Sequence, residues 1–301
     1  MKCNTLITAG NLYLSGREGD IIRSLSKRKK VLLCILLVGV ISLMIAAFDN
    51  GLTVTEYTLY SDKINNAVRI VLLTDLHSCA YGNSQQELIE RIDEQSPDII
   101  LMAGDIADDV LPVGRMLQLL EGIADRYPCY YVTGNHEFRS GEVDEMKDIF
   151  RTYAVTVLEG DCKELFINGQ YLLICGVDDP EVGEEIFDGQ LRHLSGLINP
   201  DKYVILLSHR PERFNIYAKY GYDLVLSGHA HGGQWRIPLI LPQGLLAPNQ
   251  GLFPKYTTGI HGNNNTKLII SRGLARESTR ILRIFNPPEL VVINLVPNPA
   301  I

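Results

Sequence analysis

Short apolar runs recur along most of the chain, and each of them ends in polar residues. The runs are rich in β-branched side chains and nearly uninterrupted, which is typical of strands that are buried on both faces. The runs expected to form strands are Val68–Leu73, Ile99–Ala103, Cys129–Val132, Tyr171–Cys175, Tyr203–Leu207 and Asp223–Leu226.

Between several of these runs, the apolar positions recur with helical spacing. Gln85–Gln95, Val113–Ala124 and Val143–Tyr153 each keep one apolar face, and Pro97 follows the end of the first. This spacing predicts amphipathic helices that pack against a sheet. The alternation of strands and helices predicts an α/β core with crossover connections.

Further strands are expected at the two ends of this region. A short strand is predicted at Val54–Leu59, and the final third of the chain has strand patterns at Leu268–Ser271, Ile281–Ile284 and Leu290–Leu295. No repeat, low-complexity segment or linker divides residues 49–301. We therefore expect these residues to form one domain, although length alone would allow two.

An uncharged apolar segment precedes this domain. Residues 31–48, VLLCILLVGVISLMIAAF, are 18 residues without a charge, which is the minimum for a membrane-spanning helix. The basic sequence SKRKK at 26–30 comes directly before them, and no comparable cluster follows. The positive-inside rule then places residues 1–30 in the cytoplasm and residues 49–301 on the outer side of the cell membrane. A cleaved signal peptide and a buried core helix are the alternatives.

Charge is divided unevenly between these segments. The chain has a net charge of −7, with 46% apolar and 21% charged residues, as in an ordinary globular protein. Residues 1–30 carry seven basic and two acidic residues, whereas the remainder carries 21 basic and 33 acidic ones. The net charge of −7 argues against a general nucleic-acid binder. The basic surplus of the N-terminal segment is explained by its role in orienting the membrane span.

The six cysteines form no C-x-x-C pair, so neither a zinc knuckle nor a thioredoxin-like site is indicated. Cys129 and Cys175 lie in apolar runs and are expected to be buried free thiols. The spacing gives no argument for a bridge between Cys79 and Cys162.

Polar clusters follow five of the predicted strands. They are TDLH at 74–77, GDIAD at 104–108, GNHE at 134–137, SHR at 208–210 and GHAH at 228–231. In open α/β sheets, ligands bind beyond the carboxyl ends of the strands, so clusters that are distant in the chain can meet at one site. Five of the seven histidines fall in these clusters, which indicates shared chemistry rather than isolated turns or caps.

The composition of the clusters points to metal ions. Carboxylates, imidazoles and one amide, without a thiolate, suit Mn, Fe, Zn or Mg. Side chains two residues apart can point to the same side, so the D-x-H and H-x-H pairs can each present two ligands. Seven candidate ligands exceed what one zinc ion uses, and two divalent ions fit better. The candidates are Asp75, His77, Asp105, Asn135, His209, His229 and His231.

The order D-x-H, GD-x-x-D, GNHE, an isolated His and GH-x-H resembles the signature of the calcineurin-like metallophosphoesterases. The resemblance covers about residues 68–240, and LSGHAHGGQWRIP at 226–238 is similar to a branch of single-pass or exported bacterial enzymes. It implies a four-layer αββα sandwich of two mixed β-sheets flanked by helices, with the transmembrane helix in front. The implied segments are a basic cytoplasmic tail (1–30), a transmembrane anchor (31–48) and a metallophosphoesterase domain (49–301).

The resemblance also implies a role for each motif residue. The implied ligands of the first ion are Asp75, His77 and His231, and those of the second are Asn135, His209 and His229. Asp105 would bridge the two ions, His136 would stand near the leaving group, and Asp108 would orient His136.

The implied reaction is hydrolysis of a phosphoric ester or pyrophosphate bond. Two adjacent cations would share a water and lower its pKa, and the resulting hydroxide would attack phosphorus without a covalent intermediate. Protonated His136 would stabilise the transition state or protonate the leaving oxygen. The expected partners are the membrane and a phosphorylated small molecule or a lipid-linked pyrophosphate of the UDP-diacylglucosamine type, because fold and metals do not select among phosphoesters.

Two other hypotheses compete with hydrolysis at a dinuclear centre. A non-catalytic membrane-anchored scaffold would be marked by the loss of ligands, and the chain has lost none. A mononuclear metal hydrolase of another type would leave Asn135 and His209 unexplained.

Several further residues are open to two interpretations. Arg139 and Arg210 can each bind a substrate phosphate or form a surface ion pair. Trp235 and Arg236 can line the mouth of the site, although Trp235 can also serve packing. Residues 239–241 and 245–246 are either a surface for a lipid-linked substrate or part of the core. The residues expected to have no ligand role are His193 and His261, which follow no strand, and Asp178-Asp179-Pro180, a predicted turn at the rim.

Overall fold

The computed structural model describes residues 26–263, 265–276 and 281–299. The chain divides into two compact units, Met1–Ala47 and Phe48–Ile301. Among the described residues of the first unit, Lys27–Ala47 forms helix α2, which is long and apolar enough to cross a membrane and is mostly exposed. The helix begins inside the basic cluster, four residues before the predicted span.

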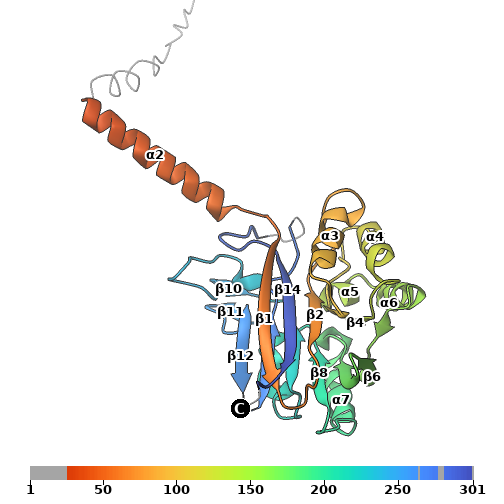
Figure 1. The fold of residues 1–301 in the computed structure, drawn as a ribbon. Coiled ribbons are helices and arrows are strands. Elements are labelled where there is room, and N and C mark those ends of the chain that lie inside the picture. Colours follow the sequence, from red (N-terminus) through yellow and green to blue (C-terminus); the bar gives the residue numbers. More distant parts are fainter. Residues whose placement is uncertain (1–25, 264, 277–280, 300–301) are drawn as a thin grey trace, which may run out of the picture. The chain divides into compact units, whose positions relative to one another are not determined.

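Two six-stranded sheets make up the second unit (Figure 1). The first sheet has the order β1-β14-β2-β3-β4-β5. Strands β2 to β5 are parallel, β14 runs antiparallel to β2, and β1 is parallel to β14. The bounds are β1 Thr53–Ser61, β2 Val68–Leu73, β3 Ile99–Ala103, β4 Cys129–Val132, β5 Thr156–Val157 and β14 Glu289–Pro297.

The second sheet has the order β12-β13-β9-β8-β7-β6. Its four inner strands are parallel, and each edge strand is antiparallel to its neighbour. The bounds are β6 Asp161–Ile167, β7 Gln170–Gly176, β8 Tyr203–Leu207, β9 Leu224–Ser227, β12 Gly259–Asn263 and β13 Thr266–Ile270. A separate two-stranded ribbon pairs β10, Leu246–Ala247, with β11, Gly251–Leu252.

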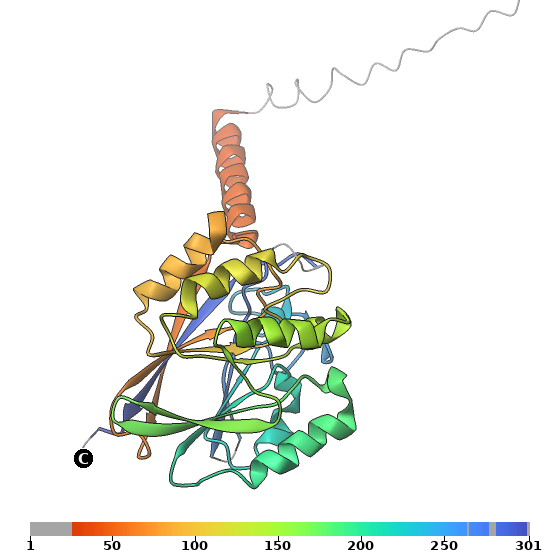
Figure 2. The same cartoon turned by 90° about the vertical axis from the view of Figure 1, so that its right-hand side faces the viewer.

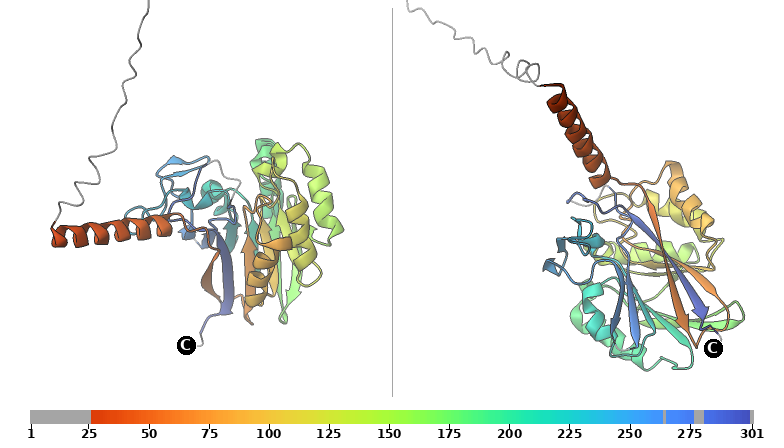
Figure 3. Two further views of the ribbon diagram at one scale, coloured as in Figure 1. Left: turned by 90° about the horizontal axis from the view of Figure 1, so that it is seen from above. Right: turned by 60° about the vertical axis from the view of Figure 1, so that its left-hand side comes forward.

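Three buried apolar layers hold the sheets and helices together. Ile70 and Leu101 of the first sheet pack with Ile174 and Leu226 of the second in the central layer. Helices α3, α4 and α6 cover the outer face of the first sheet, and α7 and α8 cover that of the second (Figures 2 and 3). The bounds are α3 Gln86–Glu94, α4 Gly114–Ile123, α5 Asn135–Arg139, α6 Val143–Thr152, α7 Glu184–Ser195 and α8 Phe214–Tyr217. The expected αββα sandwich is therefore confirmed.

The predicted elements agree closely with the structure, with one exception. Ile281–Ile284 forms no strand, and Ile284 contributes only a single bridge to Trp235. This apolar run lies on the surface, where Leu282 is exposed, so it lacks the neighbours that a buried strand requires. The edge strands β6 and β12 and helix α7 were not predicted as elements, because their sequences are mixed rather than continuously apolar.

One cysteine prediction is wrong. Cys175 is not a free thiol, because it forms a disulfide with Cys162, its register partner across the β6–β7 hairpin. Cys129 is a buried free thiol, as predicted. Disulfides persist mainly in oxidising compartments, so this bond and the apolar N-terminal helix together suggest an extracytoplasmic domain.

Candidate metal centre

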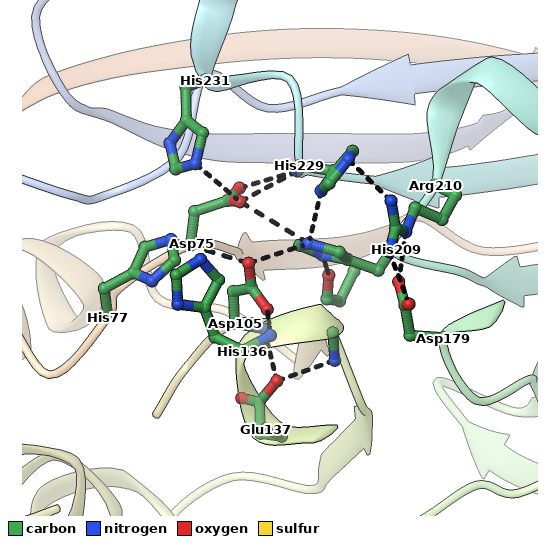
Figure 4. A network of polar contacts seen from close by, with 12 residues as sticks. Asp75, His77, Asp105, His136, Glu137, Asp179, His209, Arg210, His229 and His231 are labelled. Atoms are coloured by element: carbon green, nitrogen blue, oxygen red, sulfur yellow. Dashed lines mark hydrogen bonds and ion pairs between the residues drawn. The ribbon is translucent and has the colours of Figure 1, made fainter. Parts of the chain in front are cut away.

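The loops after β2, β3 and β4 of the first sheet meet the loops after β8 and β9 of the second (Figure 4). Backbone hydrogen bonds join the loops within the first sheet, since Asp75 N donates to Gly104 O at 3.0 Å and His77 N donates to Asp105 O at 2.9 Å. Across the sheets, His229 N donates to Asp75 Oδ1 at 2.9 Å. The polar clusters that the sequence places at strand ends therefore lie together.

The backbone of these loops is unusual. Left-handed φ angles are uncommon outside glycine, and each carries a free-energy cost of roughly 1 kcal/mol or more where the surroundings impose it. Their concentration in these loops indicates a functional site, because such strain persists where the fold holds side chains in a required position. The candidate ligands with such angles are Asp75 (φ 49°), His77 (48°), Asp105 (52°), His229 (66°) and His231 (45°).

Two motif glycines allow the loops to lie directly on the carboxylates. A Cβ atom at Gly228 would come within 2.3 Å of Asp75 Oδ2, and one at Gly134 within 2.2 Å of Asp105 Oδ1. Any larger residue at either position would displace the carboxylate. The glycines of GHAH and GNHE are therefore explained by close packing around the site.

The first group of candidate ligands is Asp75, His77 and His231. Each offers one ligand atom within 4.8 Å of the others, and all three side chains are buried. The rings of His77 and His231 are stacked with their centroids 5.2 Å apart. His231 Nε2 lies 3.8 Å from Asp75 Oδ1, which leaves room for a cation between them.

The second group is Asp105, His209 and His229, which are likewise buried and within 4.8 Å of one another. Asp105 Oδ2 lies 3.1 Å from His209 Nε2 and 3.6 Å from Nε2 of His77, a member of the first group. This carboxylate therefore lies between the two groups, where a bridging ligand would be needed.

Hydrogen bonds determine which nitrogens of the second group face the site. His209 Nδ1 donates to Ala103 O at 2.8 Å. His229 Nε2 lies 2.9 Å from Asn249 Oδ1 and 3.0 Å from Arg210 Nη1. The remaining nitrogens, His209 Nε2 and His229 Nδ1, face each other at 3.2 Å. Both nitrogens lie where a cation of the second group would be held.

Buried acceptors without donors support the same conclusion. Neither His77 Nε2 nor Asn135 Oδ1 has a hydrogen-bond partner within the part of the chain that the structure describes. An unsatisfied buried polar atom costs about 1–3 kcal/mol, which coordination to a cation would remove. The donor set of oxygen and imidazole ligands suits divalent ions. The site residues thus fit the dinuclear metal centre that their sequence suggests.

Burial and neighbouring charges shift the pKa values of the site residues. Burial lowers the pKa of His229 and His231 well below the ordinary range, so both rings are neutral. Burial opposes protonation of His209 too, but Asp105 raises its pKa to about 10. Burial likewise opposes ionisation of Asp105, yet His209 and His77 hold its pKa well below the ordinary range. Asp105 is therefore ionised, and the positive charge of His209, whose Nε2 lies 3.1 Å away, balances it.

A cleft of about 610 Å³ opens over the first group and is lined by His77, Asp108, His136 and His231. Asp108 Oδ1 accepts from His77 Nδ1 at 3.0 Å and lies 3.3 Å from His136 Nδ1. Asp109 accepts from the same His136 nitrogen at 2.7 Å. Although burial disfavours the charged ring, Asp108 and its acidic neighbours raise the pKa of His136 to about 9. Asp108 thus orients both a candidate ligand and the predicted acid.

One buried residue of the GNHE motif had no predicted role. The carboxylate of Glu137 accepts hydrogen bonds from the backbone N–H groups of Gly134, Asp105, Ile106 and Ala107, at 2.8 to 3.0 Å. It therefore holds the loop after β3 against the loop after β4. The G-x-x-E spacing is that of a capping box at the start of α5, which is a signal available in the sequence.

A buried ion pair lies behind the second group. Arg210 forms a buried rather than a surface ion pair, because Asp179 accepts from its Nε at 2.5 Å and its Nη2 at 2.7 Å. Asp179 is completely buried, so the prediction of a turn at the rim is wrong for this residue. Arg210 Nη1 donates to Asn249 Oδ1 at 2.7 Å and lies 3.0 Å from His229 Nε2, so Arg210 and Asn249 together position this ring. No sequence pattern marks Asn249.

The remaining predicted residues lie outside the two groups. Arg139 forms an exposed ion pair with Glu181 at 2.9 Å, on the rim of the cleft. Trp235 is partly exposed and donates from its ring nitrogen to Leu282 O. His193 lies on α7, and His261 on β12 contacts Thr258 O, so neither faces the centre.

Comparison with known proteins agrees with a metal centre of this kind. The family model for calcineurin-like phosphoesterases matches residues 68–233. An uncharacterized metallophosphoesterase of Campylobacter jejuni, Cj0846, is 30% identical over 272 residues, which cover 86% of this chain and 68% of that protein. The metallophosphoesterase YkuE of Bacillus subtilis is 30% identical over 257 residues, which cover 80% of this chain and 84% of that protein.

The share of a relative's length that this chain covers differs among the relatives. The chain spans 64% of the length of two metallophosphoesterases from Helicobacter pylori. Among solved structures, the NAD nucleotidase of Haemophilus influenzae matches with a TM-score of 0.47 and 14% identity, over 70% of this chain and 46% of that one. With the family model covering more than half of the chain, the protein belongs to the calcineurin-like phosphoesterase family.

Proposed function

We propose that the chain is a membrane-anchored hydrolase of phosphoric ester or pyrophosphate bonds that uses two divalent cations, Mn, Zn, Fe or Mg. The observation that carries this proposal is the pair of buried ligand groups with Asp105 between them. When bound, the cations would supply the positive charge that offsets a phosphoryl group and lowers the pKa of a water.

The proposed ligands divide as the sequence motifs suggest. The first cation would be held by Asp75, His77 and His231, and the second by Asn135, His209 and His229. Asp105 would serve both. The hydrogen bonds of His77 to Asp108 and of His209 to Ala103 O fix the ring orientations before any cation binds.

His136 is the proposed proton donor to the leaving oxygen. Its Nδ1 faces Asp108 and Asp109, which leaves Nε2 for the substrate in the cleft. The two carboxylates favour the protonated ring and hold it in place, which is what a general acid requires.

The proposed organisation is a basic cytoplasmic tail (1–30), a transmembrane anchor (31–48) and a catalytic domain (49–301) on the outer side of the cell membrane. The Cys162–Cys175 disulfide supports an outer location, and the basic cluster before α2 supports the orientation. Resistance of the chain to carbonate extraction, with cleavage of the domain by external protease in spheroplasts, is the expected result. Release of a shortened chain would indicate a cleaved signal instead.

The reaction is tested with the detergent-solubilised full chain loaded with Mn²⁺. Turnover of bis-p-nitrophenyl phosphate, p-nitrophenyl phosphate and UDP-diacylglucosamine is compared for the wild type, Asp105→Asn and the control Asp125→Asn, which alters an exposed carboxylate. We expect Asp105→Asn to abolish turnover and lower the bound metal, and the control to leave both unchanged. Full metal content and normal rate in Asp105→Asn would reject the site. Hydrolysis of no substrate by metal-loaded wild type would favour the scaffold hypothesis.

A further inference from the structure

Large apolar side chains lie exposed on the loops that follow the last metal motif. Leu239 is 99% exposed, Ile240 78%, and Leu252 and Phe253 67% each. Such side chains in contact with water are unfavourable when they lie together, and they usually mark a docking site. We call these residues the loop surface, and its members are Trp235, Ile237, Leu239, Ile240, Leu252, Phe253 and Leu282.

Hydrogen bonds join the segments of the loop surface into one layer. Trp235 Nε1 donates to Leu282 O at 2.9 Å. Leu245 N donates to Trp235 O at 2.9 Å, and Phe253 N donates to Leu245 O at 2.8 Å. The exposed side chains are therefore carried by neighbouring backbone segments, which include the β10–β11 ribbon drawn above β12 in Figure 1.

The stretch of chain that carries most of the loop surface contains no acidic residue. Residues 31–301 have a surplus of acidic over basic residues, 33 against 21, yet positions 224–276 contain no Asp or Glu. Arg272 and Arg276 are paired with Glu289 and Glu87, whereas Arg236 and Lys255 lie next to Trp235 and near Phe253 in the chain. An apolar surface with Trp and Phe beside such cations matches the acyl and headgroup regions of an anionic bilayer. The basic residues in this stretch are Arg236, Lys255, Lys267, Arg272 and Arg276.

The start of the domain lies close to the same loops. Thr53 N donates to Pro288 O at 3.0 Å, and Thr53 Oγ1 accepts from Arg272 at 2.7 Å. Asn286, two residues before Pro288, donates to Gln234 O next to the loop surface. Only five residues separate α2 from β1, and a chain of that length reaches roughly 20 Å at most. An anchor at α2 would therefore keep this end of the domain near the bilayer.

We propose that the loop surface docks on the outer leaflet of the lipid bilayer, with its apolar side chains in the acyl region and its cations among the headgroups. The proposal rests on the proposed anchor but not on the proposed hydrolysis. Ile281 and Gln234 line the cleft over the first ligand group and adjoin Leu282 and Trp235 of the loop surface. Docking would therefore open the cleft at the bilayer, where a phosphoester carried by a lipid can enter.

The single tryptophan of the chain makes this proposal directly testable. The full chain is reconstituted into vesicles of phosphatidylcholine and phosphatidylglycerol, with or without bromine atoms on the acyl chains. We expect brominated lipid to quench Trp235 fluorescence and aqueous iodide to quench it weakly. The variant Leu239→Asp/Ile240→Asp should lose quenching by lipid and gain quenching by iodide. The matched control, Ile186→Asp/Leu197→Asp, changes exposed apolar residues on and after α7 and should behave as wild type.

The outcomes separate the possible occupants of the loop surface. Strong iodide quenching without lipid quenching in the wild type would overturn the proposal, since the surface would then face water. Protection of Trp235 from both quenchers would also overturn it, in favour of a second copy or a protein partner. The readout requires no turnover, so failure of the docking and failure of the hydrolase proposal are distinguishable. Recovery of every variant in the membrane fraction with wild-type metal content shows that folding is retained.

Discussion

Replacing Glu137 by Gln tests how the two loops that carry Asp105 and Asn135 are held. Each carboxylate oxygen of Glu137 accepts two backbone N–H groups, so an amide places its NH₂ against two buried donors. Two donors without acceptors at about 2 kcal/mol each give a loss of about 4 kcal/mol. For a domain of this size, 1 kcal/mol lowers Tm by about 2–4 °C, so we expect a fall of about 8–16 °C.

The measurement is thermal unfolding of the detergent-solubilised full chain at about pH 8, in EDTA so that bound metal does not mask the change. Burial and Asp105 raise the pKa of Glu137 to about 7, so the wild-type carboxylate is ionised there. Glu142→Gln is the control, because Glu142 is exposed. Equal Tm values for Glu137→Gln and wild type would refute the reasoning that this carboxylate joins the loops.

Three further predictions follow from the site and its surroundings. Removal of metal with EDTA should abolish hydrolysis and lower Tm, and Mn²⁺ should restore both; unchanged turnover after complete removal would contradict a metal mechanism. Asn249→Leu should weaken metal binding by about 10- to 100-fold, because His229 Nε2 loses its contact with Asn249 Oδ1, one of the two that position its ring; equilibrium dialysis measures this, with the exposed Asn215→Leu as control. Cys162→Ser/Cys175→Ser should cost about 3 kcal/mol of stability in urea unfolding, the value for a loop of this length. Wild type with its disulfide reduced should then have the same free energy of unfolding as the variant. A difference between the two would contradict the view that the disulfide stabilises the domain by closing this loop.

The strands and the convergence of the polar clusters could be predicted from the sequence, because buried parallel strands leave continuous apolar runs. Val68–Leu73 and Ile99–Ala103 match their predicted bounds for this reason. Edge strands such as β6 have one face in water and a mixed sequence, so they leave no comparable pattern.

The supporting residues of the site were harder to predict. Asp179 and Asn249 act through contacts between segments that are far apart in the chain, and only the tertiary structure brings them to Arg210 and His229. Cys175 has the sequence environment of a buried thiol, and its partner is decided by the register of a hairpin whose second strand was not predicted.

Both ligand groups draw on both sheets: Asp75 and His77 follow a strand of the first sheet, and His231 follows one of the second. Asp105 on the first sheet likewise faces His209 and His229 on the second. A cation in either group would thus act as a cross-link between the halves of the sandwich, and its binding free energy would add to the resistance of the domain to unfolding. Metal scarcity would then affect the protein twice, by stopping turnover and by shortening the lifetime of the folded chain.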